Sequence, residues 1–294
     1  MSERGHVPVM LAEVMSMLTP QPGEVALDGT IGLGGHSRCI GFALGTRGHL
    51  IGIDRDPEAL AKARSALADL SCRVTLWHGN FAAAPALLAK MGVEKVDVAM
   101  LDLGVSSLQL DNPRRGFSFN RDGPLDMRMD PTQPLTAAAW LARASEEEME
   151  RVFRVYGGER FARRIARRIA EIRCQRTIDT TGRLAAIVRG AKPGRGRIDA
   201  ATRVFQAIRI VVNNELEELE RGLTGLLEIL SSGGRLAILA FHSLEDRCVK
   251  NAFRRAAITG RVRLLCRKPL RPTAVERSTN PRSRSARLRV CQKL

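Results

Sequence analysis

The chain has 294 residues, of which 44% are hydrophobic and 27% charged, and its formal net charge is +16 at pH 7. Such a composition is ordinary for a globular protein with a substantial core, in one large domain or two smaller ones. No apolar run is long enough to span a bilayer, the first residues show no signal-peptide pattern, and the six cysteines are widely spaced. We therefore expect a cytoplasmic protein with reduced thiols and no contact with a membrane.

The positive charge is concentrated in two zones. Residues 251–294 contain 13 Lys and Arg against one Glu, and residues 143–209 contain 17 against eight acidic residues, so the remainder of the chain is acidic on balance. Cations gathered in this way favour a polyanionic partner. Neither zone carries the large apolar face that inserts into lipid, so the predicted partner is nucleic acid.

In chain order, the first predicted elements are a helix over residues 12–18 and a buried strand over residues 25–27. The strand leads into a glycine-rich stretch, residues 29–35, and a helix starts near Ser37. Glycine allows a ligand to approach the backbone, and a helix start presents free N–H groups. Strand–loop–helix units of this kind hold nucleotide-like cofactors in doubly wound sheets. His6 is either a site residue beside this loop or an ordinary surface histidine.

Three more predicted strands follow, each ending in polar residues. They cover residues 49–53, 73–77 and 96–101, with a helix over residues 57–70 between the first two. Asp54, at the carboxyl end of its strand, can accept both hydroxyls of a ribose. Phe81 is either a flat face for adenine or a core residue. The stretch from Asp102 to Gln109 is expected to face whatever the cofactor reacts with, because ligands bind at the carboxyl ends of parallel strands.

The strand–helix alternation stops at Pro113, and helical patterns dominate until about residue 202. Two loop-like stretches at its start, residues 114–120 and 123–131, combine arginines with aromatic residues. This mixture suits stacking and phosphate contact with a single strand, and it equally suits a packed surface loop. We also expect a mobile basic loop over residues 192–197 and one long helix from Asp199 to near Ser231.

Strand patterns return at the end of the chain, over residues 235–241, 262–266 and 286–291. The sequence thus predicts an α/β protein with a mostly parallel sheet of about seven strands. One discontinuous cofactor-binding domain is expected from residues 1–112 and 203–294, and an inserted, mainly helical domain from residues 113–202.

The glycine-rich stretch departs from the dinucleotide fingerprint, because a serine stands at the position of the third glycine. Together with the seven-stranded layout, this favours S-adenosylmethionine over a nicotinamide cofactor. Residues 32–36 would cradle the methionine end, Asp54 would bind the ribose and Phe81 would cover the adenine. A nicotinamide-dependent oxidoreductase and a non-catalytic ribosome-assembly or RNA-binding factor remain as alternatives, and no histidine spacing supports a metal site.

Eight ordered motifs make the chain resemble a known family. They are residues 6–10 (HVPVM), 28–37 (DGTIGLGGHS), 102–107 (DLGVSS), 115–119 (RGFSF), 125–129 (LDMRM), 205–210 (FQAIRI), 241–247 (FHSLEDR) and 280–286 (NPRSRSA). The resemblance is to the bacterial 16S ribosomal RNA (cytosine-N4)-methyltransferases of the MraW type, and it runs from His6 almost to the C-terminus.

The resemblance implies a Rossmann-like class I methyltransferase that uses S-adenosylmethionine, with an inserted helical domain for RNA recognition. It implies methylation, in the cytoplasm, of the exocyclic amine of one cytosine in the decoding region of the small ribosomal subunit. It also suggests a homodimer. The cofactor contacts that it implies are Gly34, Gly35, His36, Asp54, Phe81, Asp102 and Gln109.

The expected reaction makes demands that can be stated from chemistry alone. A cytosine amine is a poor nucleophile, because its lone pair is delocalised into the ring, so the enzyme must align it and accept its hydrogen bonds. Many amino-methyltransferases use an Asp/Asn-Pro-Pro-aromatic turn for this purpose, whereas this chain has Asp-Leu-Gly-Val at residues 102–105. Asp102 is the predicted catalytic residue. The predicted substrate contacts are Arg115, Phe117, Phe119, Arg128 and His242.

Overall fold

The computed structural model describes residues 7–192 and 199–294, and it divides the chain into two compact units. The first unit holds Met1–Gly104 and Leu216–Leu294, and the second holds Val105–Glu215. Residues 105–112 and 203–215, which the sequence-based boundaries assign to the cofactor-binding domain, fall in the second unit. The reason is packing, because Val105, Leu110 and the apolar side of residues 204–212 join the core of that unit. His6 and residues 193–197 of the predicted basic loop lie outside the described residues.

The first unit is built on a seven-stranded sheet in the order β3-β2-β1-β4-β5-β7-β6. Its strands are β1 (Val25–Asp28), β2 (His49–Asp54), β3 (Arg73–His78), β4 (Val96–Asp102), β5 (Leu230–Ala240), β6 (Val262–Leu264) and β7 (Arg287–Lys293). Only β7 runs antiparallel to its neighbours. All seven predicted strands are present, and the mostly parallel sheet is confirmed.

Alternate residues of the central strands enter two separate cores, one on each face of the sheet. In β4, for example, Ala99 and Leu101 belong to one core, and Val98 and Met100 to the other. A strand covered on both faces must be apolar at every position, which explains the uninterrupted apolar runs in the sequence.

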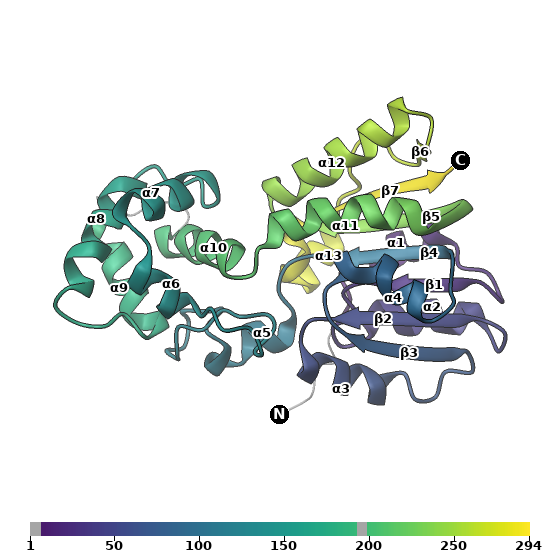
Figure 1. The fold of residues 1–294 in the computed structure, drawn as a ribbon, viewed down its shortest axis with the longest axis horizontal. Coiled ribbons are helices and arrows are strands. Elements are labelled where there is room, and N and C mark those ends of the chain that lie inside the picture. Colours follow the sequence, from purple (N-terminus) through teal and green to yellow (C-terminus); the bar gives the residue numbers. More distant parts are fainter. Residues whose placement is uncertain (1–6, 193–198) are drawn as a thin grey trace. The chain divides into compact units, whose positions relative to one another are not determined.

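Helices cover both faces of this sheet (Figure 1). One core contains side chains of α4 (Ala84–Lys90), α11 (Glu215–Ile229) and α12 (Ser243–Ile258). The other contains side chains of α1 (Leu11–Leu18), α2 (Gly35–Leu44) and α3 (Pro57–Ala66). A short helix, α13 (Ala274–Thr279), lies in the connection between β6 and β7. The result is a three-layer α/β unit, the architecture that places ligands at the carboxyl edge of the strands.

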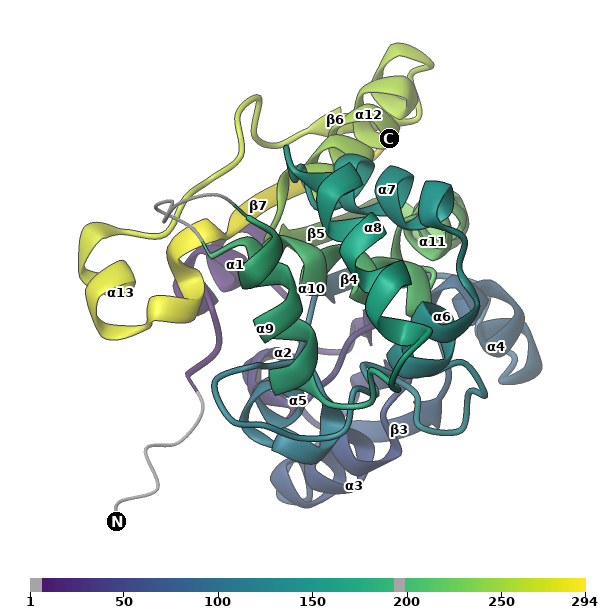
Figure 2. The ribbon, with the colours of Figure 1, turned by 90° about the vertical axis from the view of Figure 1, so that its left-hand side faces the viewer.

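The second unit is helical, as the sequence predicts for residues 113–202 (Figure 2). It consists of α5 (Ser107–Asp111), α6 (Ala137–Arg143), α7 (Glu146–Val155), α8 (Ala162–Arg173), α9 (Thr181–Ala191) and α10 (Ala200–Val212). In α8 the apolar stripe of Ile165, Ile169 and Ile172 is buried. Among the described residues, no helix in either unit is both long and apolar enough to cross a membrane.

The prediction of one long helix from Asp199 to near Ser231 is wrong. The structure breaks it into α10 and α11 at Asn213 and Asn214, and Asn214 has φ of 49°. The Asn213 side chain accepts a hydrogen bond from the Met129 amide at 2.7 Å and donates one to the Met127 carbonyl at 2.7 Å. Asparagine tolerates the left-handed region better than most residues, so this pair ends one helix where an apolar pattern alone would continue it.

Candidate cofactor site

The loop between β1 and α2 exposes backbone where the sequence predicts a cofactor. Gly32 and Gly34 have φ of 52° and 82°, a left-handed conformation that glycine adopts without a steric cost. A Cβ built on Gly32 would meet no described atom closer than 3.8 Å, so the space beside this residue is open. Gly34 is the N-cap of α2 and has no side chain to cap the helix. The start of α2 thus presents backbone N–H groups that the N-cap residue does not satisfy.

Asp28, the last residue of β1, holds this loop in shape from beneath. Its side chain is 2% exposed, accepts a 2.6 Å hydrogen bond from the Ser37 hydroxyl and accepts a 3.1 Å bond from the Thr30 amide. The Thr30 hydroxyl in turn accepts a 2.6 Å hydrogen bond from the Asp102 amide. The ends of β1 and β4 and the first turn of α2 are thus linked through two side chains. The sequence motif of residues 28–37 contains both Asp28 and Ser37, but it does not indicate this role for either of them.

Asp54 lies at the end of β2, where the sequence places it. Oδ2 accepts a hydrogen bond from the Gly32 amide at 2.8 Å, and Oδ1 accepts one from the Asp56 amide at 2.9 Å. Burial raises the pKa of this carboxyl, and the two amide hydrogen bonds oppose the rise. Each oxygen retains a further lone pair, so the carboxylate can still accept the two hydroxyls of a ribose.

Asp102 ends β4 beside the first turn of α2. Oδ2 is 3.7 Å from Nδ1 of His36, and the other ring nitrogen of His36 is 2.9 Å from the Val9 carbonyl oxygen. Oδ1 of Asp102 is buried and has no hydrogen-bond partner among the described residues. An acceptor left in this state costs free energy unless a ligand satisfies it, so Oδ1 marks a position for a hydrogen-bond donor.

Several buried carboxyl groups lie close together at this edge of the sheet. Burial raises the pKa of Asp102 to about 8, and the negative charges of Asp28 and Glu245 add to the rise. Burial also raises the pKa of Asp28 to about 6, with Asp54 adding to it. A cation bound among these groups would favour their ionised forms. The site is therefore suited to a positively charged ligand.

Phe81 follows β3 and lies in the core beneath the glycine loop. It is 8% exposed, and a Cβ on Gly29 would come within 2.8 Å of its Cβ. A Cβ on Gly222 of α11 would come within 2.4 Å of its ring. Most of the ring is thus packed against protein, which fits the core interpretation, and its contact with adenine stays a prediction.

His242 and Glu245 form the start of α12, directly after β5. The His242 ring accepts a 3.4 Å hydrogen bond from the Glu245 amide as the N-cap, and Nε2 lies 3.0 Å from Oε1 of Glu245. Glu245 is 2% exposed and accepts a 2.8 Å hydrogen bond from the Phe241 amide. These contacts position Glu245 near Asp102, a feature that the sequence signals only through an acidic residue three positions after the N-cap.

The other predicted site residues belong to the second unit. Gln109 forms a capping box with Ser106 at the start of α5. Phe117 is 9% exposed in the core of this unit, and Phe119 packs edge-on against Phe205 with ring centroids 5.0 Å apart.

The two arginines predicted to contact substrate are held by their own loop. Arg115 donates to the carbonyls of Arg128 and Met129, both at 3.0 Å, and Arg128 forms a two-point pair with Asp126. The structure gives these groups a structural role, and their contact with RNA stays a prediction.

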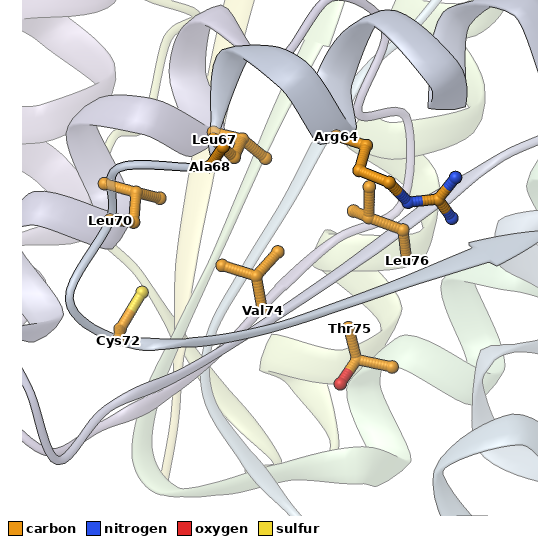
Figure 3. Close-up of a pocket in the computed structure, with 8 residues that line it drawn as sticks. All are labelled: Arg64, Leu67, Ala68, Leu70, Cys72, Val74, Thr75 and Leu76. Atoms are coloured by element: carbon orange, nitrogen blue, oxygen red, sulfur yellow. The ribbon is translucent and has the colours of Figure 1, made fainter.

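A hollow of about 500 Å³ lies elsewhere, between the end of α3 and β3 (Figure 3). Its lining is mostly apolar, with Leu67, Leu70, Cys72 and Val74 beside a single charged residue, Arg64. The lining of this hollow contains no carboxylate and no glycine, so it does not match the predicted cofactor. The carboxyl edge of the sheet has both and does match it.

The residues at that edge fit S-adenosylmethionine for three reasons. The backbone at Gly32 has open space beside it, Oδ1 of Asp102 is a buried acceptor without a partner among the described residues, and the carboxyl groups suit a cation. The strand order with one antiparallel strand, together with this site, defines a Rossmann-like class I methyltransferase that depends on S-adenosylmethionine. The chain belongs to the MraW methylase family, whose model matches residues 3–294.

Known relatives cover nearly the whole chain. It is 50% identical to "Ribosomal RNA small subunit methyltransferase H" of Syntrophotalea carbinolica, over 98% of each chain. It is 46% identical to the protein of the same name from Geobacter sp. strain M21, over 100% of each chain. Among solved structures, TrmN of Thermus thermophilus aligns with a TM-score of 0.47 and 13% identity, over 97% of this chain and 48% of that one.

Proposed function

We propose that this protein transfers the methyl group of S-adenosylmethionine to the N4 amine of one cytosine in the decoding region of 16S ribosomal RNA. The observation that carries the substrate class is the full-length similarity to relatives named as methyltransferases of small-subunit ribosomal RNA. The net charge of +16 is consistent with a nucleic-acid substrate. We propose the cytoplasm as its location, and a homodimer stays a prediction.

The cofactor is assigned to the carboxyl edge of the first unit. Gly34, Gly35 and His36 would hold its methionine end, and Asp54 would bind its ribose. Phe81 and Gln109 are proposed as further contacts. S-adenosylmethionine supplies an electrophilic methyl group on a sulfonium centre. The positive charge of that centre matches the carboxyls of Asp28, Asp102 and Glu245.

Asp102 is the proposed catalytic residue. During attack, the cytosine amine changes from a planar group to a tetrahedral one and becomes more acidic. A fixed acceptor stabilises its N–H groups at that stage. Oδ1 of Asp102 is buried and carries no hydrogen bond among the described residues, so it can accept such a bond without breaking another. This geometry supports Asp102 as acceptor despite the absence of an Asn-Pro-Pro-aromatic turn.

The second unit and the start of α12 supply the proposed substrate contacts: Arg115, Phe117, Phe119, Arg128 and His242. Two alternatives were a nicotinamide-dependent oxidoreductase and a non-catalytic factor. Neither explains why the chain belongs to a methylase family.

The test is methylation of small ribosomal subunits from a strain that lacks the enzyme, followed by nucleoside analysis of the digested RNA. We expect N4-methylcytidine. A methyl group on C5 or on a ribose hydroxyl would contradict the proposed position. Asp102→Ala should abolish turnover and retain the fold. Asp97→Ala at the other end of β4 serves as the control, because its carboxylate binds only the Val25 amide and the Ser231 hydroxyl in the described structure.

A further inference from the structure

Most of the connection between β6 and β7 is formed by residues 265–285, named here the basic connection. It lies at the same edge of the sheet as the cofactor site. β6 and β5 both pair antiparallel with β7, so they run in the same direction. β7 begins at Arg287 opposite Ala240, the last residue of β5. The chain therefore leaves β6 and re-enters β7 at the carboxyl edge, where β1, β2 and β4 end in Asp28, Asp54 and Asp102.

This basic connection is fixed to the segment that covers the glycine loop. Glu276 of α13 accepts a 2.7 Å hydrogen bond from the Met10 amide, and Asn280 donates a 3.2 Å bond to the Val7 carbonyl. Figure 2 shows α13 beside the segment that leads into α1. In the same segment, the Val9 carbonyl contacts His36, and a Cβ on Gly35 would lie 2.5 Å from Pro8. One short segment thus contacts both α13 and the first turn of α2.

The basic connection carries a net positive charge. Its exposed cations are Arg267, Lys268, Arg271, Arg277, Arg282 and Arg284. Its single acidic residue, Glu276, accepts the hydrogen bond from the Met10 amide. By contrast, Arg287 and Arg289 at the start of β7 both pair with Asp246 of α12. Among the described residues, no ion pair involves Arg271, Arg277 or Arg284. Cations that are left exposed in this way on an anchored backbone are suited to an external polyanion.

We propose that the basic connection binds backbone phosphates of the substrate RNA beside the target nucleotide. The proposal rests on the proposed function. It means that the first unit has an RNA-binding surface in addition to the predicted contacts in the second unit. Phosphate is favoured over bases, because the exposed side chains are cationic and no aromatic residue lies among residues 265–285. A membrane is disfavoured, because Val275 is the only large hydrophobic residue exposed in the connection, and a single such residue cannot insert a surface into lipid.

The test compares two triple variants in methylation of small ribosomal subunits that lack the modification. The first, Arg271→Ala/Arg277→Ala/Arg284→Ala, removes three cations of the basic connection. The control, Arg254→Ala/Arg255→Ala/Arg261→Ala, removes three exposed cations at the end of α12 and before β6, at the opposite edge of the sheet. Both variants lose the same net charge, so they differ only in the place of that charge.

We expect the first variant to raise the KM for the subunits roughly tenfold and to reduce the salt slope of binding by about 2, since each phosphate contact contributes about 0.7–0.9. Its affinity for S-adenosylmethionine and its kcat at saturating subunits should stay unchanged. Arg271→Lys/Arg277→Lys/Arg284→Lys should restore most of the binding, because Lys also pairs with phosphate.

Equal KM and salt slope in the first variant and the wild type would overturn the proposal, and so would an equal loss in the control. A first variant that no longer binds S-adenosylmethionine would also overturn it, because the cations would then act on the cofactor site. Failure of the wild type to methylate the subunits would instead remove the proposed function itself.

Discussion

Asp102 and His36 approach each other at the carboxyl edge of the sheet, where Oδ2 of Asp102 lies 3.7 Å from Nδ1 of the His36 ring. Nε2 of His36 lies 2.9 Å from the Val9 carbonyl, an acceptor, so Nε2 must carry the proton in order to donate it. At 3.7 Å, Nδ1 is too far from Oδ2 of Asp102 for a hydrogen bond, and Oδ1 has no hydrogen-bond partner among the described residues. Burial raises the pKa of Asp102 to about 8, and the negative charges of Asp28 and Glu245 add to the rise.

The first prediction concerns the pH dependence of cofactor binding. With a pKa of about 8, Asp102 is mostly protonated at pH 7 in the free protein, whereas a bound sulfonium cation favours its ionised form. Binding should therefore release a proton below pH 8. The affinity should rise by up to about tenfold per pH unit as the pH approaches 8 and should level off above it. Calorimetry between pH 6.5 and 9, in buffers with different ionisation enthalpies, measures both effects.

Asp102→Asn is the matched control, because it keeps the shape of the side chain and cannot ionise. It should remove the released proton near pH 8 and flatten the affinity profile. An unchanged profile in this variant would assign the linkage to another group, such as Asp28, whose pKa is raised to about 6.

Asp54 gives the second prediction. If its carboxylate accepts two ribose hydroxyls, Asp54→Ala should weaken S-adenosylmethionine binding by about 2–4 kcal/mol, roughly 30- to 1,000-fold. The affinity of Asp54→Asn should lie between those of the wild type and Asp54→Ala. Its single carbonyl oxygen can still accept the hydrogen bond from the Gly32 amide, which Asp54 accepts at 2.8 Å. Titration calorimetry gives both affinities. Equal binding by the wild type and Asp54→Ala would exclude the ribose contact.

The centre of the sheet could be predicted from the sequence because strands such as β2 and β4 are buried on both faces and are therefore mainly apolar. The break at Asn213 could not, because it depends on hydrogen bonds to Met127 and Met129, which lie far away in the sequence. The same limit applies to the site. Asp54 and Asp102 could be found because each follows a strand. The roles of Ser37 and Glu245 depend on partners that only the folded chain brings near, and the packing of Phe119 on Phe205 has no sequence signal.

The third prediction uses two glycines of α11 to test Phe81. A Cβ on Gly222 would lie 2.4 Å from the Phe81 ring, whereas a Cβ on Gly225 would lie 2.7 Å from Pro85. Gly222→Ala and Gly225→Ala should each cost about 1–3 kcal/mol of stability through overpacking. If Phe81 covers the adenine, only Gly222→Ala should also weaken cofactor binding. Thermal unfolding and calorimetry on both variants decide this, and equal cofactor affinities would leave Phe81 as a core residue alone.

The last prediction concerns the link between the end of α10 and the loop that holds Arg128. Asn213 is 2% exposed and satisfies the Met129 amide, the Met127 carbonyl and the Arg209 carbonyl. Asn213→Ala leaves these backbone groups buried without this partner, which should destabilise the second unit by about 2–4 kcal/mol. Hydrogen exchange should then accelerate in residues 105–215 and stay unchanged in the strands of the first unit.

The neighbouring Asn214 supplies the control for this experiment. Its φ of 49° suits glycine, so Asn214→Gly should preserve the break between the helices at a cost below about 1 kcal/mol. If Asn213→Ala exchanged no faster than Asn214→Gly, the break would depend on backbone conformation rather than on the Asn213 side chain. Faster exchange in Asn213→Ala alone would show that three hydrogen bonds of one buried amide hold the loop of Met127 and Met129 against α10.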